Sequence, residues 1–154
     1  MYTTEKPHQR HPQQGENDPQ LDEVAAAIFN IVNEETAIMV HNMTFQGGIS
    51  QGSATTKHAL IHTDSPLAGF IGLCSWLPKH AGNSELTRGA SKTPVYLSHS
   101  LDDETISMEY GPELRDMLIA MGMQVEWDEL KDGRHWINGP KGMDNTATLL
   151  RQHM

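Results

Sequence analysis

Hydrophobic residues are scarce at the start of the chain and become periodic further along it. Residues 1–20 are mainly Gln, Pro, His, Glu and Asn, and such a segment buries too little apolar surface to offset the entropy lost on ordering it. We therefore expect a disordered polar tail over 1–20. Asp18 and Pro19 suit the N-cap and the first position of a helix. Apolar residues then recur at helical spacing, at Leu21, Val24, Ala25, Ile28, Ile31 and Val32. This pattern predicts an amphipathic helix that ends near Glu35.

Short apolar stretches separated by helical segments follow this first helix. The stretch 38–45 is predicted as a strand that leads into a glycine-rich turn and a helix over 53–61. The stretch 67–74 is predicted as a buried strand, because it is apolar and rich in glycine without alternation. The remaining predicted elements are a strand over 95–97, a helix opened by Pro112, a strand over 125–130 and a terminal helix that reaches 154.

Two of the later helices carry apolar stripes that predict which face is buried. The helix opened by Pro112 carries Leu114, Met117, Leu118 and Met121, and the terminal helix carries Met143, Ala147, Leu150 and Met154. Strands that alternate with helices indicate a mostly parallel sheet of about four strands with helices on both faces. The predicted fold class is therefore α/β, with one domain over 21–154.

Composition and charge exclude several classes of function. The 154 residues carry a net charge of −9, which works against binding a phosphate backbone, so nucleic acid is not an expected partner. The sequence also lacks the roughly 18 to 20 consecutive apolar residues of a membrane-spanning helix. The single cysteine, Cys74, cannot form an internal disulfide, and no signal peptide is evident near Met1. We therefore expect a reducing, cytoplasmic location, with Cys74 as a small core residue.

The segment 48–52 reads Gly-Ile-Ser-Gln-Gly and follows a predicted strand directly before a predicted helix. A G-x-S-x-G sequence in this position is typical of a nucleophile elbow, in which a serine hydroxyl projects from a sharp turn. The two glycines would let the strand and the helix approach each other closely. The same sequence also suits an ordinary tight turn with a solvated Ser50, so the segment alone does not identify a nucleophile.

An acid and a base follow Ser50 in the order that a catalytic triad requires. A serine hydroxyl attacks only when a histidine removes its proton, and that histidine needs a carboxylate to fix its tautomer. Asp102 and Asp103 lie in the loop after the strand that begins at Val95, and His135 lies in the loop after the strand 125–130. These loops meet at one edge of a parallel sheet. The pattern predicts a Ser-Asp-His triad in which either aspartate is available as the acid.

Four segments together resemble the acyl-protein thioesterase, carboxylesterase and lysophospholipase family of the α/β-hydrolase superfamily. Segment 48–52 resembles its G-F/L-S-Q-G elbow, and Ser75-Trp76-Leu77-Pro78 is similar to its S-x-W-L-P stretch. Segment 99–106 resembles its H-G-x-x-D-x-x-V, and 133–136 resembles the segment that carries the triad histidine. The resemblance extends from Leu21 to the C-terminus, and its spacing identifies Asp103 rather than Asp102 as the triad acid.

This resemblance implies the C-terminal part of an α/β-hydrolase that cleaves carboxylic esters or thioesters without a cofactor. It implies Ser50 as nucleophile, His135 as base, Asp103 as the acid that holds His135, and the backbone N–H of Gln51 as an oxyanion donor. The expected substrate is an acylated protein, a lysophospholipid or a simple carboxylic ester.

Some departures from the family keep other interpretations open. Family members carry strands and an H-G-x-G loop before the elbow, and residues 1–20 supply neither. Losing one oxyanion donor costs about 100- to 1,000-fold in turnover. The chain is therefore also interpreted as an inactive, truncated hydrolase-like protein that acts at most as a binding partner and self-associates through an exposed sheet edge. A third interpretation is an incomplete copy of a longer enzyme. Smaller departures are Ser100 in place of glycine and Arg134, whose charge would disfavour a protonated His135.

Several other chemically active side chains are assigned structural roles. His99 is expected to be a structural loop residue. His58 and His62 lie four positions apart on a predicted helix, but a zinc site needs at least a third ligand, so no metal site is predicted. Trp76 suits either a packed loop anchor or the lining of an acyl pocket.

Overall fold

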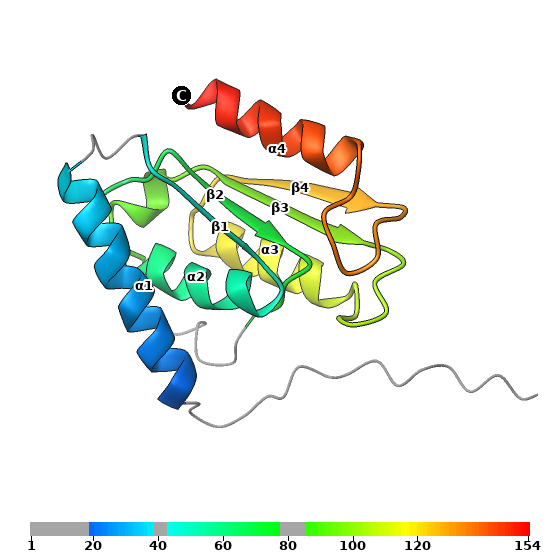
Figure 1. Ribbon diagram of the computed structural model, residues 1–154, viewed down its shortest axis with the longest axis horizontal. Helices are drawn as coiled ribbons and strands as arrows, with labels where there is room; N and C mark the ends of the chain where they lie inside the picture. Colours follow the sequence, from blue (N-terminus) through cyan, green and yellow to red (C-terminus); the bar gives the residue numbers. More distant parts are fainter. Residues whose placement is uncertain (1–18, 39–42, 78–85) are drawn as a thin grey trace, which may run out of the picture.

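The computed structural model describes residues 19–38, 43–77 and 86–154 (Figure 1). Its elements in chain order are α1 (Pro19–Ile38), β1 (Phe45–Ile49), α2 (Gln51–Ile61), β2 (Gly69–Leu73), the 3-10 helix η3 (Ala90–Lys92), β3 (Val95–Ser100), α3 (Tyr110–Ala120), β4 (Val125–Leu130) and α4 (Lys141–Gln152). The predicted disordered tail falls mainly on residues 1–18, which lie outside the described ranges, while Pro19 begins α1 as expected.

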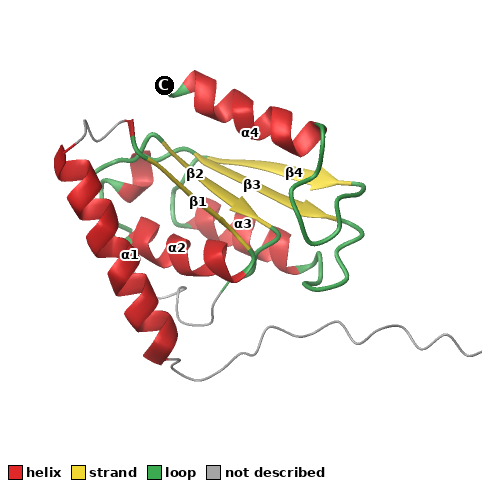
Figure 2. Cartoon of the chain, viewed as in Figure 1, coloured by secondary structure: helices red, strands yellow, loops and turns green. Residues whose placement is uncertain are grey.

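The strands form one parallel sheet in the order β1-β2-β3-β4. Each strand therefore pairs with the next strand along the chain, and all four point toward the same edge of the sheet (Figure 1). Helices α1, α2 and α3 lie on one side of this sheet and α4 lies on the other (Figure 2). The expected α/β class, with about four parallel strands and helices on both faces, is confirmed.

Each face of the sheet has its own hydrophobic cluster. The larger cluster lies on the α2 and α3 side and includes Val32, Leu60, Leu67, Phe70, Val95, Leu97, Leu114, Leu118 and Met123. The smaller cluster lies beneath α4 and consists of Leu73, Tyr96 and Leu149, with Ile49 and Ile71 packed against it. No helix in the described part of the chain is both long enough and apolar enough to cross a membrane. Within that part, β1 forms one edge of the sheet.

The first strand begins later than its hydrophobic pattern predicts. Ile38 is the last residue of α1, and β1 covers Phe45–Ile49 and so contains Gly47 and Gly48, two of the glycines that were expected to form the turn. A Cβ on Gly47 would lie 2.9 Å from the carbonyl oxygen of Ile71 on the neighbouring strand. Glycine is needed there because β1 and β2 are closely packed, and not because the chain turns. The predicted strand positions 39–42 lie outside the described residues.

The later elements agree in type with the predictions but differ at their ends. Strand β3 continues past Leu97 to Ser100, which places His99 within the strand and not in a loop. Helix α3 begins at Tyr110, before Pro112, and its Leu114 and Leu118 are buried as predicted. Strand β4 matches the predicted range 125–130.

Two helices bury a different set of residues from the predicted stripe. On α1, Val24 and Ile31 are exposed while Val32 is buried, because this helix packs beside α2 at the margin of the larger cluster. On α4, the predicted Met143 is exposed and the buried residues are Gly142 and Leu149.

The buried face of α4 contains small and polar residues that a hydrophobic pattern cannot detect. A Cβ on Gly142 would lie 3.2 Å from both Asn138 and Leu130, so glycine permits close packing at the start of the helix. One turn further along, the side-chain amide of Asn145 donates to Asp128 on β4. These contacts select a helix face on which Leu149 is the large apolar residue.

Among the described residues, Lys57 is a buried lysine. Lys57 lies on α2 with 1 % of its surface exposed, and its Nζ donates a hydrogen bond of 2.8 Å to the main-chain oxygen of Trp76. Burial disfavours the charged ammonium group and lowers the pKa of Lys57 to about 7. Hydrophobic periodicity gives no signal for this residue, because a lysine in a helix is assigned to the exposed face.

The free energy of unfolding is expected to rise with pH between the folded-state pKa and the unfolded-state pKa of Lys57. Between about pH 7 and pH 10 the unfolded chain keeps a proton on Lys57 that the folded chain has released, so raising the pH favours the folded state. Relative to Lys57→Met, the free energy of unfolding of the unaltered chain should increase by on the order of 3 kcal/mol across that range. Urea unfolding at several pH values measures this difference. A difference that stays constant with pH would contradict a buried, largely neutral amine.

Candidate active site

Ser50 occupies a strained turn between β1 and α2. Its backbone has φ 56° and ψ −127°, a conformation that is costly for a residue with a side chain. The Ser50 N–H donates to the Leu73 carbonyl at 2.9 Å, and the Ser50 carbonyl accepts from the Ser75 hydroxyl at 3.2 Å and from the Ala54 N–H at 3.1 Å. These three hydrogen bonds hold the strained residue at the carboxyl-terminal edge of the sheet.

Only one of the two glycines beside Ser50 is required by packing. A Cβ on Gly48 would lie 2.5 Å from the Ser53 nitrogen and 2.6 Å from the Gly52 carbonyl carbon, so a larger residue would force the helix away from the strand. A Cβ on Gly52 would meet nothing within 4 Å. We expected both glycines to let the strand and the helix approach each other closely. This expectation is wrong for Gly52.

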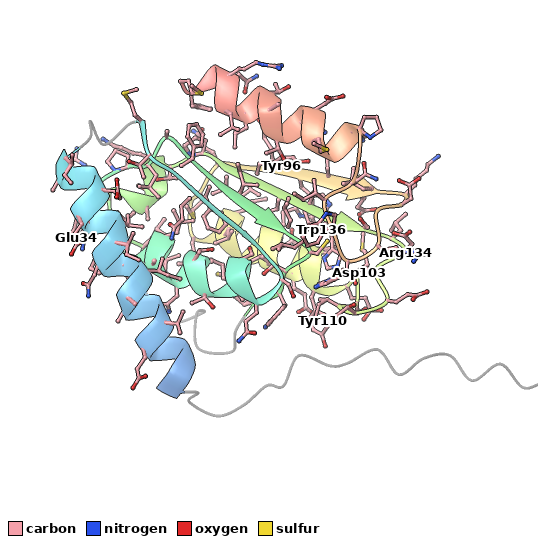
Figure 3. The ribbon with its side chains drawn as sticks, in the orientation of Figure 1. Glu34, Tyr96, Asp103, Tyr110, Arg134 and Trp136 are labelled. Atoms are coloured by element: carbon pink, nitrogen blue, oxygen red, sulfur yellow. The ribbon has the colours of Figure 1, made fainter. Side chains whose placement is uncertain are left out.

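Asp103 and His135 are joined by a hydrogen bond at the same edge of the sheet. The His135 Nδ1 lies 2.9 Å from Asp103 Oδ2, and the Asp103 side chain is 0 % exposed. The other oxygen, Oδ1, accepts backbone N–H groups of Thr105 at 2.8 Å and Ile106 at 2.9 Å. Because two main-chain donors occupy Oδ1, the carboxylate is oriented with Oδ2 toward His135. Figure 3 shows Asp103 beside the loop that carries Arg134 and Trp136.

His99 donates a second hydrogen bond to the same carboxylate oxygen. Its Nε2 lies 3.1 Å from Asp103 Oδ2 and 3.2 Å from the Ile106 carbonyl oxygen. Both partners accept hydrogen bonds, so Nε2 carries the proton. The His99 Nδ1 has no hydrogen-bond partner among the described residues. His99 is therefore a neutral donor to Asp103. Its expected position in a loop is wrong, because it lies within β3.

Burial and the interactions with neighbouring groups have opposite effects on the pKa of His99, and likewise on the pKa of Asp103. Burial lowers the pKa of His99, and the nearby charge of Asp103 offsets only part of that effect. Burial alone would raise the pKa of Asp103, but hydrogen bonds from His135 and from the backbone of Ile106 and Thr105 bring it below its usual value. Asp103 therefore stays ionised and His99 stays neutral at neutral pH.

Asp102 holds the backbone of the histidine loop. Its Oδ1 accepts the Arg134 N–H at 2.8 Å, and Arg134 has a positive φ of 52°. The side-chain amide of Asn138 donates to the main-chain oxygen of Asp132 across the same loop. Asp103 bonds the imidazole of His135, whereas Asp102 bonds the main chain directly before it.

Cys74 lies beside the Asp103–His135 pair. It follows β2 with a positive φ of 47°, is buried, and its Sγ lies 3.8 Å from the Arg134 carbonyl oxygen and 3.7 Å from that of Trp136. Burial and the negative charge of Asp103 raise the pKa of the thiol to about 12. The sequence indicates its burial correctly but not its position beside a carboxylate, because that position depends on contacts between distant segments.

The structure gathers these side chains from the ends of neighbouring strands. Hydrogen bonds connect His99, Asp103 and His135. Ser50 is held at the same edge because Ile49 pairs with Leu73 and the Ser50 N–H bonds the Leu73 carbonyl. Gln51 begins α2, so its N–H belongs to the first turn, where helical N–H groups have no acceptor within the helix.

The histidine pair on α2 is separate from this cluster. The rings of His58 and His62 lie 4.8 Å apart between centroids. Among the described residues, the group of three potential metal ligands that lie close together is Cys74, Asp103 and His135, so this part of the chain supplies no third ligand to the pair.

Comparison with known proteins places the chain in a family. The phospholipase/carboxylesterase family model matches residues 8–154. The chain belongs to the phospholipase/carboxylesterase family. The match begins before Leu21, where the sequence resemblance was placed, and it covers every element of the described fold.

Curated members of the phospholipase/carboxylesterase family match a large part of the chain. Acyl-protein thioesterase 1 of Gibberella zeae is 30 % identical over 111 residues, which cover 70 % of this chain and 47 % of the relative. The probable carboxylesterase SOBER1-like of Arabidopsis thaliana is 30 % identical over 108 residues, which cover 70 % of this chain and 41 % of the relative. The chain thus spans about half the length of the curated relatives it matches.

Solved structures share the fold. The crystal structure of Arabidopsis thaliana SOBER1 has a TM-score of 0.82 at 23 % identity, covering 90 % of this chain and 67 % of that chain. The crystal structure of Zea mays acyl-protein thioesterase 2 has a TM-score of 0.72 at 22 % identity, covering 94 % and 69 %. At these identities the likeness establishes the fold alone, and the fold is that of the α/β-hydrolases.

Proposed function

We propose that this member of the phospholipase/carboxylesterase family hydrolyses carboxylic esters or thioesters, with Ser50 as nucleophile, His135 as base and Asp103 as its orienting acid. The observation that carries the proposal is the 2.9 Å contact between His135 Nδ1 and the fully buried Asp103 Oδ2. The strained backbone of Ser50 at the same sheet edge supports it.

The hydrogen-bond pattern supports a separate chemical role for each nitrogen of His135. Asp103 Oδ2 keeps the proton on Nδ1, so Nε2 has a free lone pair that accepts the Ser50 proton as Oγ attacks the acyl carbonyl. The Gln51 N–H donates to the oxyanion that forms. His135 then passes the proton to the leaving thiol or alcohol, and water cleaves the acyl-enzyme to release the acid.

The names of the relatives support the choice of substrate class. They are called acyl-protein thioesterase and carboxylesterase, so we propose an acylated protein or a small lipid or ester as substrate. The proposed steps use side chains and backbone groups alone. A cytoplasmic location and self-association through the β1 edge remain predictions.

The first test is covalent labelling of the full 154-residue chain. A fluorophosphonate reacts with an activated serine, whose Oγ bonds to phosphorus as fluoride leaves. We expect one label per chain by intact-mass spectrometry, lost in Ser50→Ala and in His135→Ala. Ser91→Ala is the matched control, because Ser91 lies in η3 and its hydroxyl donates to the Arg88 carbonyl away from the site. This variant should label as the unaltered chain does.

Circular dichroism on each variant separates loss of folding from loss of chemistry. A folded chain that stays unlabelled would overturn the proposal and favour the inactive, partner-binding interpretation. Labelling that persists in Ser50→Ala would assign the nucleophile to another serine.

His99 is expected to act as a positioning residue for Asp103. His99→Leu removes a hydrogen bond to a buried carboxylate, worth about 1.5 kcal/mol or more, and should lower kcat about tenfold with little change in KM. His99→Gln keeps an N–H donor near Nε2 and should recover most of the activity. Steady-state hydrolysis of a short-chain nitrophenyl ester measures both. Equal losses in the two variants would indicate that His99 contributes packing alone.

A further inference from the structure

Three side chains at the site present the ligand atoms that zinc prefers. Cys74, Asp103 and His135 each offer one sulfur, oxygen or nitrogen atom, and these atoms all lie within 4.8 Å of one another. Thiolate, carboxylate and imidazole are the usual ligands of zinc in proteins. The residues come from three loops at the sheet edge, and the hydrogen bond between Asp103 and His135 fixes two of them.

We propose that Zn²⁺ binds between Cys74 Sγ, Asp103 Oδ2 and His135 Nδ1 and that this binding inhibits the enzyme. The inhibitory part rests on the proposed function, whereas the metal site itself does not. A Ser-Asp-His triad alone would offer zinc two ligands, Asp103 and His135. In this chain Cys74 supplies a third ligand.

The geometry requires only small movements. Zinc lies about 2.3 Å from sulfur and about 2.0 to 2.2 Å from nitrogen or oxygen, so ligand atoms around a tetrahedral ion are roughly 3.3 to 3.6 Å apart. Asp103 Oδ2 and His135 Nδ1, now 2.9 Å apart, would separate slightly, and Cys74 Sγ would move inward by up to about an ångström. The His135 side chain is 24 % exposed, so an ion and a fourth, water ligand can enter from its side.

The protons and charges of this step balance. The Cys74 thiol gives its proton to solvent when sulfur binds the metal, and the neutral imidazole of His135 moves its proton from Nδ1 to Nε2. The thiolate and the Asp103 carboxylate then neutralise the two positive charges of the ion. Burial raises the pKa of the free thiol to about 12, so the thiol stays protonated until a metal ion displaces the proton.

The shift of the imidazole proton explains why zinc would inhibit hydrolysis. The metal replaces the hydrogen bond between His135 Nδ1 and Asp103 Oδ2 that fixes the tautomer. With a proton on Nε2, His135 has no lone pair to accept the proton of Ser50. The nucleophile is therefore not activated, although it remains in place.

Within the described ranges, the pair formed by His58 and His62 is a competing site for zinc. His58 lies in α2 and His62 is the C-cap residue of that helix, with the two ring centroids 4.8 Å apart, and such pairs bind zinc when a third ligand is near. A double variant, His58→Gln with His62→Gln, removes that pair without touching Cys74. It is the matched control for Cys74→Ser.

The test measures metal binding directly on the full chain. Calorimetric titration with ZnCl₂ should give one ion per chain, with affinity lowered at least about 100-fold by Cys74→Ser and unchanged by the His58/His62 double variant. Titration with Co²⁺ provides a readout that needs no variant, because a bound thiolate produces a sulfur-to-metal charge-transfer band in the near ultraviolet. Zn²⁺ should also block fluorophosphonate labelling of the unaltered chain, and Cys74→Ser should label in its presence.

Each outcome separates the metal site from the proposed function. Co²⁺ binding without the charge-transfer band, or zinc affinity that survives in Cys74→Ser and disappears in the double variant, overturns the site. A charge-transfer band on a chain that never reacts with fluorophosphonate supports the metal site and counts against the hydrolase. Cysteine-dependent binding that leaves labelling intact overturns inhibition by zinc.

Discussion

Asp103→Asn is expected to lower kcat by about ten-thousandfold while the protein stays folded. The reason lies in the two main-chain donors on Asp103 Oδ1, the N–H groups of Thr105 and Ile106. In the variant the carbonyl oxygen of the introduced asparagine should face these donors, because a main-chain N–H always carries its proton, whereas the imidazoles of His99 and His135 at the Oδ2 position can change tautomer. The NH₂ group therefore occupies the Oδ2 position and points at His135.

An NH₂ group in that position forces the wrong tautomer on His135. It donates to Nδ1, so the imidazole proton moves to Nε2 and the base is lost. The change is nearly isosteric, and the backbone hydrogen bonds of the turn are retained. Binding of substrate should therefore change little, and the loss should fall on kcat.

Asp102→Asn is the matched control for this prediction. Asp102 accepts a single backbone N–H, from Arg134, and an asparagine carbonyl oxygen can replace that acceptor. Steady-state kinetics with a nitrophenyl ester should show a loss of more than about a thousandfold for Asp103→Asn and nearly full activity for Asp102→Asn. Comparable losses in both variants would contradict the separate roles assigned to the two aspartates.

Gly48→Ala is expected to destabilise the fold by about 3 kcal/mol and to abolish labelling of Ser50. The added Cβ would overlap the backbone of α2 at 2.5 Å, and backbone atoms cannot move aside as a flexible side chain can. The helix would shift away from β1 and carry the Ser50 turn with it. Both stability and chemistry should therefore be lost together.

Gly52→Ala changes the other glycine of the same five-residue segment and is expected not to destabilise the fold. Nothing lies within 4 Å of the Cβ that would be added, and the residue belongs to α2, where alanine is favoured over glycine by up to about 1 kcal/mol. Thermal and urea unfolding of both variants measure the contrast. Similar destabilisation by the two substitutions would show that the turn is sensitive to any side chain and not to the packing of Gly48.

The alternation of strands and helices was predictable because it depends on local patterns. Runs of apolar residues and helical spacing repeat within single segments, and a parallel order follows from helices between successive strands. Helix faces were predicted less well. On α4, Gly142 and Leu149 are buried while Met143 is exposed, because a polar contact to Asp128 and a close approach near Asn138 select the buried side.

The sequence indicated some residues of the candidate site but not others. Ser50 and His135 stand out because a motif and an order of residues mark them, and their catalytic roles remain proposals. The choice of Asp103 over Asp102 needed the family resemblance, because the two are adjacent in sequence. His99 and Cys74 gave no local signal of their place in the site, since each becomes informative only through its position beside the Asp103 carboxylate in the folded chain.

The sequence by itself determined the α/β class, the order of the elements, the turn between a strand and a helix at Ser50, and the positions of Asp103 and His135 in loops after strands. These properties are encoded in residues close together in the chain. Only the tertiary structure decided which oxygen of Asp103 faces His135, why Gly48 cannot carry a side chain, and that Lys57, His99 and Cys74 are buried beside polar partners. Such properties arise where strands and loops distant in sequence come within a few ångströms, and no local pattern records that approach.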